Sequence, residues 1–227
     1  MGWFRRSKAS QNKAIGDEGA APGYAAAEES GEDETKVTKL TSVPSEDFGP
    51  YDASQRDTSQ GYLDFGALYL PSVPGVQIQP EFGADGSSIN RLGVVVGSSR
   101  LNIMVAASPT TGGSWDRVRQ KTLESVANEG VKAREVKGRW GTEIQAASSG
   151  TTPDGRKVKN FIRIVGVEGP RWVLRIDIQG PAAVEEAAFN QVSEIIDNIV
   201  VYRDKSPRPP ESVIALTLPQ ELIDKLH

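Results

Sequence analysis

The chain has 227 residues but no cysteine, and its single histidine is His227. Disulfides are therefore excluded, and the thiolate and imidazole ligands of common zinc sites are missing. The fold has to be stabilised by the burial of apolar side chains, and we expect it to need no metal, disulfide or cofactor. The same absences exclude a cysteine nucleophile and leave no internal histidine for a Ser-His-Asp triad.

The first quarter of the chain differs in composition from the rest. Residues 1–58 are rich in small and acidic residues and poor in bulky apolar side chains. Such a segment does not bury enough surface to offset the entropy of ordering its backbone. We predict a disordered acidic leader over residues 1–58 and a single α+β domain over residues 60–204. A Pro-rich connector and an apolar tail follow over residues 205–227, and the aliphatic side chains of this tail predict that it packs on the domain.

The net charge of −4 is distributed unevenly along the chain. Residues 1–13 carry four basic residues and no acid, residues 14–60 carry three basic against eleven acidic residues, and the remainder balances at nineteen of each. A neutral domain lacks the positive field that nucleic-acid binding needs, which disfavours nucleic acid as a partner. No stretch approaches the ~20 apolar residues of a membrane span. The basic start predicts at most a weak membrane contact, and without a signal-peptide pattern we expect a cytoplasmic protein.

Apolar periodicity predicts an antiparallel β-sheet covered by two main helices, an α+β fold. Ser114 is expected to be the N-cap of the first helix, which covers residues 115–129 and ends before Gly130. Pro181 is expected to open the second helix. The buried face of that helix would comprise Val184, Ala188, Val192, Ile195 and Ile199. The expected strands cover residues 68–70, 76–78, 91–96, 100–107, 158–167, 172–179 and 199–202, with a further period-two segment from residue 131.

The two strongest strands are expected to form a hairpin, and the inward face of the second strand includes Trp172. On the first strand we expect Ile164 to share that face, which requires an odd number of residues in the turn. A three-residue turn pairs Arg163 with Asp177 on the outer face, whereas a five-residue turn sets two arginines side by side. We therefore predict a three-residue turn over residues 169–171.

Several motifs together resemble one family. The chain is similar to the actinobacterial family known as domain of unknown function 3710, and the run from Gly169 to Trp172 (Gly-Pro-Arg-Trp) is the most specific piece. The resemblance implies a cytoplasmic actinobacterial setting and no known reaction. The family usually has Asp at the position of Glu168, and Arg where this chain has Thr110, so a ligand contact of that Arg would be lost here. The motifs cover residues 70–75, 106–116, 138–143, 165–175 and 216–219.

The order of the elements also resembles the Mog1/PsbP-type α/β sandwich. That resemblance implies a curved antiparallel sheet with one helix in mid-chain and one long helix near the C-terminus. Domains of this shape often act as adaptors or accessory proteins, which favours an interaction role, although fold alone does not fix function.

Six residues are candidates for an interaction or anion-binding site, and no residue is assigned a catalytic, cofactor or metal role. An arginine in a rigid Gly-Pro turn would present a fixed guanidinium fork to a carboxylate or phosphate. An Arg-Trp pair would offer a cation–π or partner surface, and charged side chains, with Glu143, would line the outer face of the sheet. The alternative is structural: buried tryptophans and a solvated charge lattice. The candidates are Arg139, Trp140, Arg163, Arg171, Arg175 and Asp177.

Two functions remain open from the sequence. The first is a non-enzymatic interaction or adaptor module that docks another protein. The second is a protein that binds a small anionic molecule, or a cryptic enzyme, using arginines and carboxylates in a cleft between sheet and helix. A concave pocket with a converging Arg163 or Arg175 would favour the second, and a flat exposed patch the first.

Overall fold

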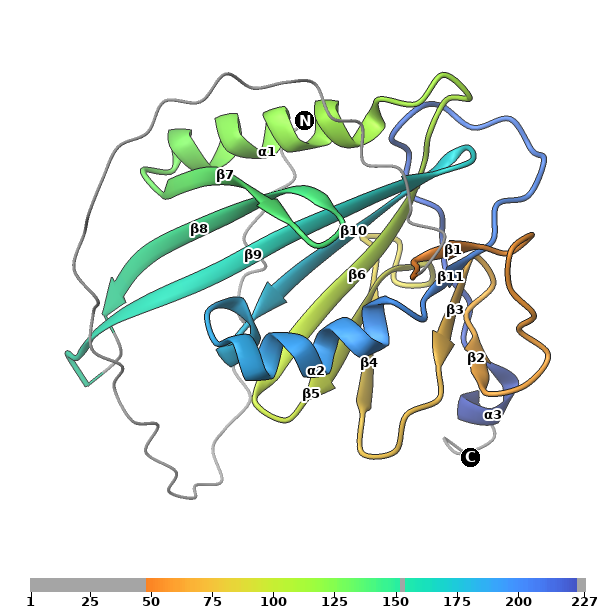
Figure 1. Ribbon diagram of the computed structural model, residues 1–227, viewed down its shortest axis with the longest axis horizontal. Coiled ribbons are helices and arrows are strands. Elements are labelled where there is room, and N and C mark those ends of the chain that lie inside the picture. The colour runs from red at the N-terminus through yellow and green to blue at the C-terminus, as the bar shows by residue number, and fades with distance from the viewer. Residues whose placement is uncertain (1–47, 152–153, 224–227) are drawn as a thin grey trace. The chain divides into compact units, whose positions relative to one another are not determined.

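The computed structural model describes residues 48–151 and 154–223, all within one compact unit (Figure 1). The predictions for residues 1–47 lie outside the described residues. The strands are β1 (Tyr51–Asp52), β2 (Tyr62–Asp64), β3 (Leu68–Pro71), β4 (Gln77–Phe82), β5 (Ile89–Val96), β6 (Ser99–Ala107), β7 (Lys132–Gly138), β8 (Gly141–Thr151), β9 (Lys157–Gly169), β10 (Trp172–Gln179) and β11 (Val200–Val201). The helices are α1 (Ser114–Asn128), α2 (Glu186–Ile196), the short α3 (Gln220–Ile223) and the 3-10 helix η1 (Pro181–Ala183).

The strands form two sheets. The large sheet has seven strands in the order β4-β5-β6-β10-β9-β8-β7, and the small sheet has four in the order β1-β11-β3-β2. Every neighbouring pair in the large sheet is antiparallel, whereas β1 pairs with β11 in parallel. The α+β class and the antiparallel sheet with two main helices are therefore confirmed.

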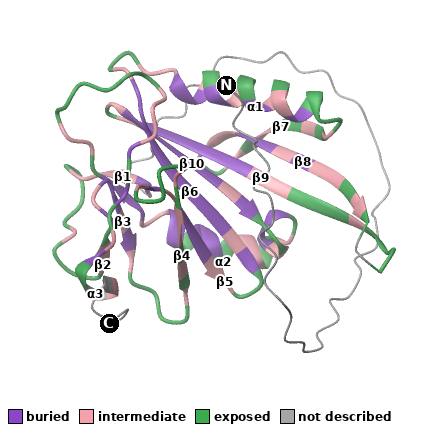
Figure 2. Ribbon diagram, turned by 180° about the vertical axis from the view of Figure 1, so that it is seen from behind, coloured by how far each residue is buried: buried purple, intermediate pink, exposed green. Residues whose placement is uncertain are grey.

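The large sheet has two differently covered faces. One face packs against α2, η1 and the small sheet and forms the main core. The other face is covered by α1, whose Trp115 and Val118 pack on Ile144, Ile164 and Val173. We call these the α2 face and the α1 face. The central strands β6 and β10 are buried along nearly their whole length (Figure 2).

The strands β7, β8 and β9 form the opposite side of the sheet from β4, and we call them the wing. Burial decreases outward along the wing: β7 has no buried residue, and the first residues of β9 are mostly exposed (Figure 2). The outer part of the wing is therefore less covered than the centre of the sheet.

The helix predictions need two corrections. The first helix begins at Ser114, and its N-cap is Gly113 at φ 82, so Ser114 is already helical. The second helix begins later than predicted, since Pro181 opens only the short η1 and α2 begins at Glu186. As a result Val184 precedes α2 and is 54% exposed rather than buried.

The register of the β9–β10 hairpin was predicted wrongly. Trp172 pairs with Gly169 and Ile176 with Val165, so the turn has two residues, Pro170 and Arg171. Arg171 adopts φ 65, the sign of φ that the second central residue of a type II turn has, and Pro is common before it in such turns. Because the turn is even-numbered, Val165 and not Ile164 shares the core face with Trp172. Arg163 lies opposite Ile178, so it forms a cross-strand pair with neither Asp177 nor Arg175.

The folded unit includes residues that the sequence assigned to the leader. Tyr51 pairs with Val200 in the small sheet, and Asp52 accepts a hydrogen bond of 2.8 Å from Trp172 Nε1. At the other end, Val213 forms an isolated bridge with Ala106, and Ile214 and Leu216 are buried. That the tail stabilises the domain stays a prediction.

Candidate binding groove

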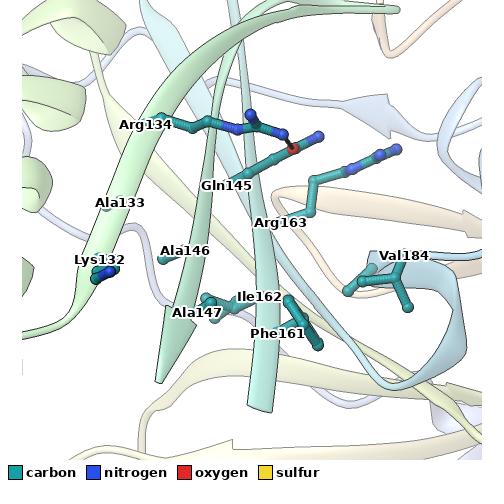
Figure 3. Close-up of a pocket in the computed structure, with 11 residues that line it drawn as sticks. Lys132, Ala133, Arg134, Gln145, Ala146, Ala147, Phe161, Ile162, Arg163 and Val184 are labelled. Atoms are coloured by element: carbon teal, nitrogen blue, oxygen red, sulfur yellow. Dashed lines mark hydrogen bonds between the residues drawn. The ribbon is translucent and has the colours of Figure 1, made fainter. Parts of the chain in front are cut away.

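Two adjoining hollows lie between the wing and the segment that leads into α2. Their volumes are about 480 and 420 Å³. Both are lined by Arg134, Gln145, Arg163 and Val184, and Figure 3 shows residues that line the larger one. They therefore make up one elongated depression, which we call the wing groove.

A row of three polar side chains crosses the floor of the wing groove. Arg134 of β7 pairs with Gln145 of β8, which pairs with Arg163 of β9. Residues directly opposite on neighbouring strands share a face, so all three project from the same side of the sheet. Arg134 Nη2 donates to Gln145 Oε1 at 3.3 Å (Figure 3). With strands ~4.8 Å apart, the two arginine backbones are about 10 Å apart, close enough to bind one extended anionic ligand together.

Arg163 is held from two sides. Its guanidinium carbon lies 3.9 Å from the ring centroid of Phe189 on α2, and its Nε lies 3.2 Å from Glu143 Oε1. The side chain is 17% exposed. Within the described part of the chain, Nη1 and Nη2 of Arg163 have no hydrogen-bond partner. The ring and the carboxylate thus fix the guanidinium and leave two donors for an anion.

Glu143 is the buried carboxyl group beside this arginine. It is 3% exposed, and its Oε1 accepts a hydrogen bond of 3.3 Å from Gln145 Nε2. Its Oε2 is buried and has no hydrogen-bond partner among the described residues. Burial raises the pKa of Glu143 above its ordinary value, and Arg163 and Gln145 oppose the rise only in part.

The walls of the wing groove combine positive charge with apolar surface. Phe161 is 43% exposed and Val184 is 54% exposed, and both line the larger hollow. Three cations project from the α2 face of the wing into the groove and give this side of it a positive charge that attracts anions: Lys132, Arg134 and Arg163. The acids of the lining are Glu143, Glu185 and Glu186.

The Arg139-Trp140 pair lies at one end of the groove but is engaged within the fold. Arg139 donates to both carboxylate oxygens of Asp197, at 3.1 and 2.7 Å, and its guanidinium lies 4.1 Å from the ring centroid of Phe48. Trp140 is buried, and its Nε1 donates to Asp197 Oδ1 at 2.9 Å. These contacts agree with a structural role, and a role of the pair in binding stays a prediction.

The other three candidate residues lie elsewhere. Arg171 is at the tip of the β9–β10 hairpin, away from the wing groove. Arg175 and Asp177 lie on the α1 face, where Arg175 Nε donates to Asp177 Oδ1 at 2.7 Å and Arg175 Nη1 donates to Thr122 of α1 at 3.1 Å. The outer-face grouping of Glu143, Arg163, Arg175 and Asp177 is therefore wrong, because the first two and the last two project from opposite faces.

A second buried glutamate closes the N-terminal end of α1. Glu168 Oε1 accepts from Ser114 N at 2.9 Å, and Oε2 accepts from Gly113 N at 3.0 Å and Trp115 N at 3.3 Å. The Ser108 hydroxyl donates to Oε1 as well. The backbone donors that a helix N-terminus offers to an anion are thus already occupied by the protein itself. Neither this role of Glu168 nor a place of Arg134, Gln145 and Val184 in a binding site was predicted from the sequence.

Residues 48–151 and 154–223 contain neither a cluster of metal ligands nor a membrane-spanning helix. In these ranges, no three or more His, Cys, Asp or Glu side chains come together in a way that could hold a metal ion. Nor does any helix there have the length and apolar character needed to cross a membrane.

Comparison with known proteins places the chain in a family. No curated protein matches it. Among solved structures, it is similar to the solution structure of cyanobacterial PsbP (CyanoP) from Synechocystis sp. PCC 6803, with 13% identity, a TM-score of 0.34, and coverage of 64% of this chain and 89% of that chain. The family model described as a protein of unknown function, DUF3710, matches residues 49–225. The chain therefore belongs to the DUF3710 family, as its sequence motifs indicated.

Proposed function

We propose that this protein is a non-enzymatic interaction module that docks an acidic, partly apolar segment of a partner protein in the wing groove. The observation that carries the proposal is Arg163, whose two terminal nitrogens lack partners among the described residues while its charge is fixed over Phe189. The proposal includes the cytoplasmic, actinobacterial setting that the sequence led us to expect.

The shape of the groove favours an extended segment over a compact molecule. Small-molecule sites bury most of the ligand surface, whereas both of these hollows are partly open to solvent. Arg134 and Arg163 would bind successive carboxylates, and Phe161 and Val184 would contact apolar side chains between them. An acidic segment also brings a charge opposite to that of the groove, which speeds association and selects against basic partners.

A small anionic molecule is the second candidate. The larger hollow, about 480 Å³, lies within the usual range of small-molecule sites, and Arg163 converges on it. Such a ligand would have to be short enough to use one arginine only, so loss of Arg134 would leave its binding unchanged.

The test uses a rhodamine-labelled peptide in which Glu and Leu alternate, followed by fluorescence polarisation. We expect Arg163→Gln and Arg134→Gln each to weaken binding about tenfold, the scale of one charge-assisted contact. The matched control is Arg91→Gln, which removes the same charge from β5, where Arg91 neighbours the inward-facing Leu92 and so projects from the opposite face. A peptide with Lys in place of Glu should not bind. Equal affinity for all three variants would overturn the proposal.

A further inference from the structure

The carboxyl of Glu143 is the feature of the wing groove that anion docking does not explain. A buried oxygen without a hydrogen-bond partner is costly, and the cost is largest for an ionised group. Glu143 Oε2 is in this situation within the described structure. It faces Gly138, where an added Cβ atom would come within 2.2 Å of it, so any other residue there would force the carboxyl to move.

Glu143 and a docked anion compete for the same positive charge. Arg163 Nε lies 3.2 Å from Glu143 Oε1, so an ionised Glu143 neutralises much of the field that Arg163 directs into the groove. A neutral Glu143 removes that competition. Burial penalises the charged form of Glu143, and an anion docked beside it penalises that form further, so both favour the neutral carboxyl.

We propose that Glu143 is a positioning residue that makes docking in the wing groove proton-linked: the neutral carboxyl frees Arg163 to bind an anion, and the ionised carboxylate withholds it. This inference rests on the proposed function and adds its regulation. Docking of an acidic segment then takes up a proton at Glu143, and affinity rises as the pH falls.

Other charged groups surround Glu143 in the groove, but the pKa of Glu143 responds, besides burial, to Arg163 and Gln145. None of the remaining charged groups adds a further cause to this pKa shift. Glu185 and Glu186 carry the other carboxyl groups of the groove lining. The charged groups are Arg163 from β9, Arg134 and Lys137 from β7, Arg139 from the β7–β8 turn, and Glu185 and Glu186 from the start of α2.

The experiment uses the full chain and a rhodamine-labelled peptide in which cysteic acid alternates with Leu. Its sulfonates stay ionised, so any pH dependence belongs to the protein. Between about pH 8 and about pH 5, we expect wild-type affinity to rise about tenfold, the scale of one neutralised charge beside a partly buried guanidinium. Glu143→Gln should bind tightly at both limits, with its curve meeting that of the wild type at acidic pH.

Two controls separate the possible failures. Arg163→Gln should bind weakly at every pH. If the wild type binds with dependence on Arg163 but follows the same pH profile as Glu143→Gln, the proton linkage is overturned and the docking function stands. Binding that ignores Arg163 overturns both. Should Glu143→Gln fold poorly in thermal melts, carboxyl-carbon NMR of the wild type decides: the pKa of Glu143 has to rise when the peptide binds, and an unchanged pKa overturns the linkage.

Discussion

Two buried glutamates on opposite faces of the same sheet have opposite surroundings. Glu168 on the α1 face accepts hydrogen bonds at both oxygens from the backbone donors at the start of α1. Glu143 on the α2 face has one oxygen near Arg163 and Gln145 and one without a partner among the described residues. The two residues are similarly buried, 9% and 3% exposed, so burial alone does not distinguish them.

The difference shows which of the two carboxyl groups the fold depends on. A carboxylate whose oxygens accept several hydrogen bonds from the start of a helix holds the loop before that helix in place. A buried carboxyl group with one oxygen that lacks a hydrogen-bond partner stabilises the fold less than a fully hydrogen-bonded one. Such groups are common at functional sites. We therefore interpret Glu168 as structural and Glu143 as functional, and the predictions below test that contrast.

The largest effect is expected for Glu168→Gln. The amide NH2 has to face the donors of one of the two carboxylate oxygens, so either the Ser114 N–H or the N–H groups of Gly113 and Trp115 lose their acceptor. We expect a loss of about 3 kcal/mol in the free energy of unfolding, since hydrogen bonds to a buried charge are among the strongest. Urea unfolding measures it. Glu143→Gln is the matched control and should cost clearly less; equal costs would contradict the contrast.

A smaller effect is expected for two glycines that lie against the two faces. A Cβ atom at Gly166 would lie 2.1 Å from ring atoms of Trp115, which is buried and tied by its Nε1 to the Thr142 carbonyl at 2.8 Å. Because that ring has no room to move, Gly166→Ala should cost about 2 kcal/mol. At Gly138 the obstacle is the flexible end of Glu143, so Gly138→Ala should cost about half as much.

Thermal melts of the two alanine variants measure this difference. The same change on the same sheet, with different neighbours, makes each variant the control of the other. A higher cost at Gly138 than at Gly166 would show that the Glu143 side chain is held rigidly, which would argue against a carboxyl that adapts to docking.

The positions of helices and strands were predicted from the sequence better than the face of the sheet from which each side chain projects. Strands over residues 91–107 and 172–179 and the helix over residues 115–129 agree with the structure within a few residues, because alternation and helical spacing are strong there. β9 was different: Ile162 and Ile164 face α1, while Val165 and Val167 face the main core. A strand that is apolar on both faces gives no alternation to read, so Arg163 could not be assigned to its face.

The binding groove was only partly predictable for the same reason. Arg163 was a candidate, but its neighbours Arg134 and Gln145 come from strands whose register sets which residues lie opposite each other. The capping role of Glu168 joins residues more than fifty positions apart, Ser114 among them, so no local helix signal contains it. Had the turn been predicted with two residues, Pro170 and Arg171, Glu168 would have been assigned to the α1 face and Arg163 to the α2 face.

The smallest effect, and the one that bears most directly on Glu143, is the pH dependence of stability. The pKa of Glu143 is raised in the folded protein from an ordinary value of 4.5, so the folded state binds the proton more tightly than the unfolded chain. The stabilisation from this residue is therefore fully present below the unfolded pKa and is lost as the pH rises through the folded pKa. Glu143→Gln has no such proton. The urea midpoint of this variant should fall below that of the wild type at acidic pH and approach or exceed it near neutrality. The corresponding change in the free energy of unfolding should be smaller than the loss expected for Glu168→Gln. The difference between the two urea midpoints, measured across pH, isolates Glu143 from the other carboxyl groups. A difference that does not vary with pH would mean that Glu143 titrates alike in both states, and the contrast with Glu168 would then concern hydrogen bonding alone.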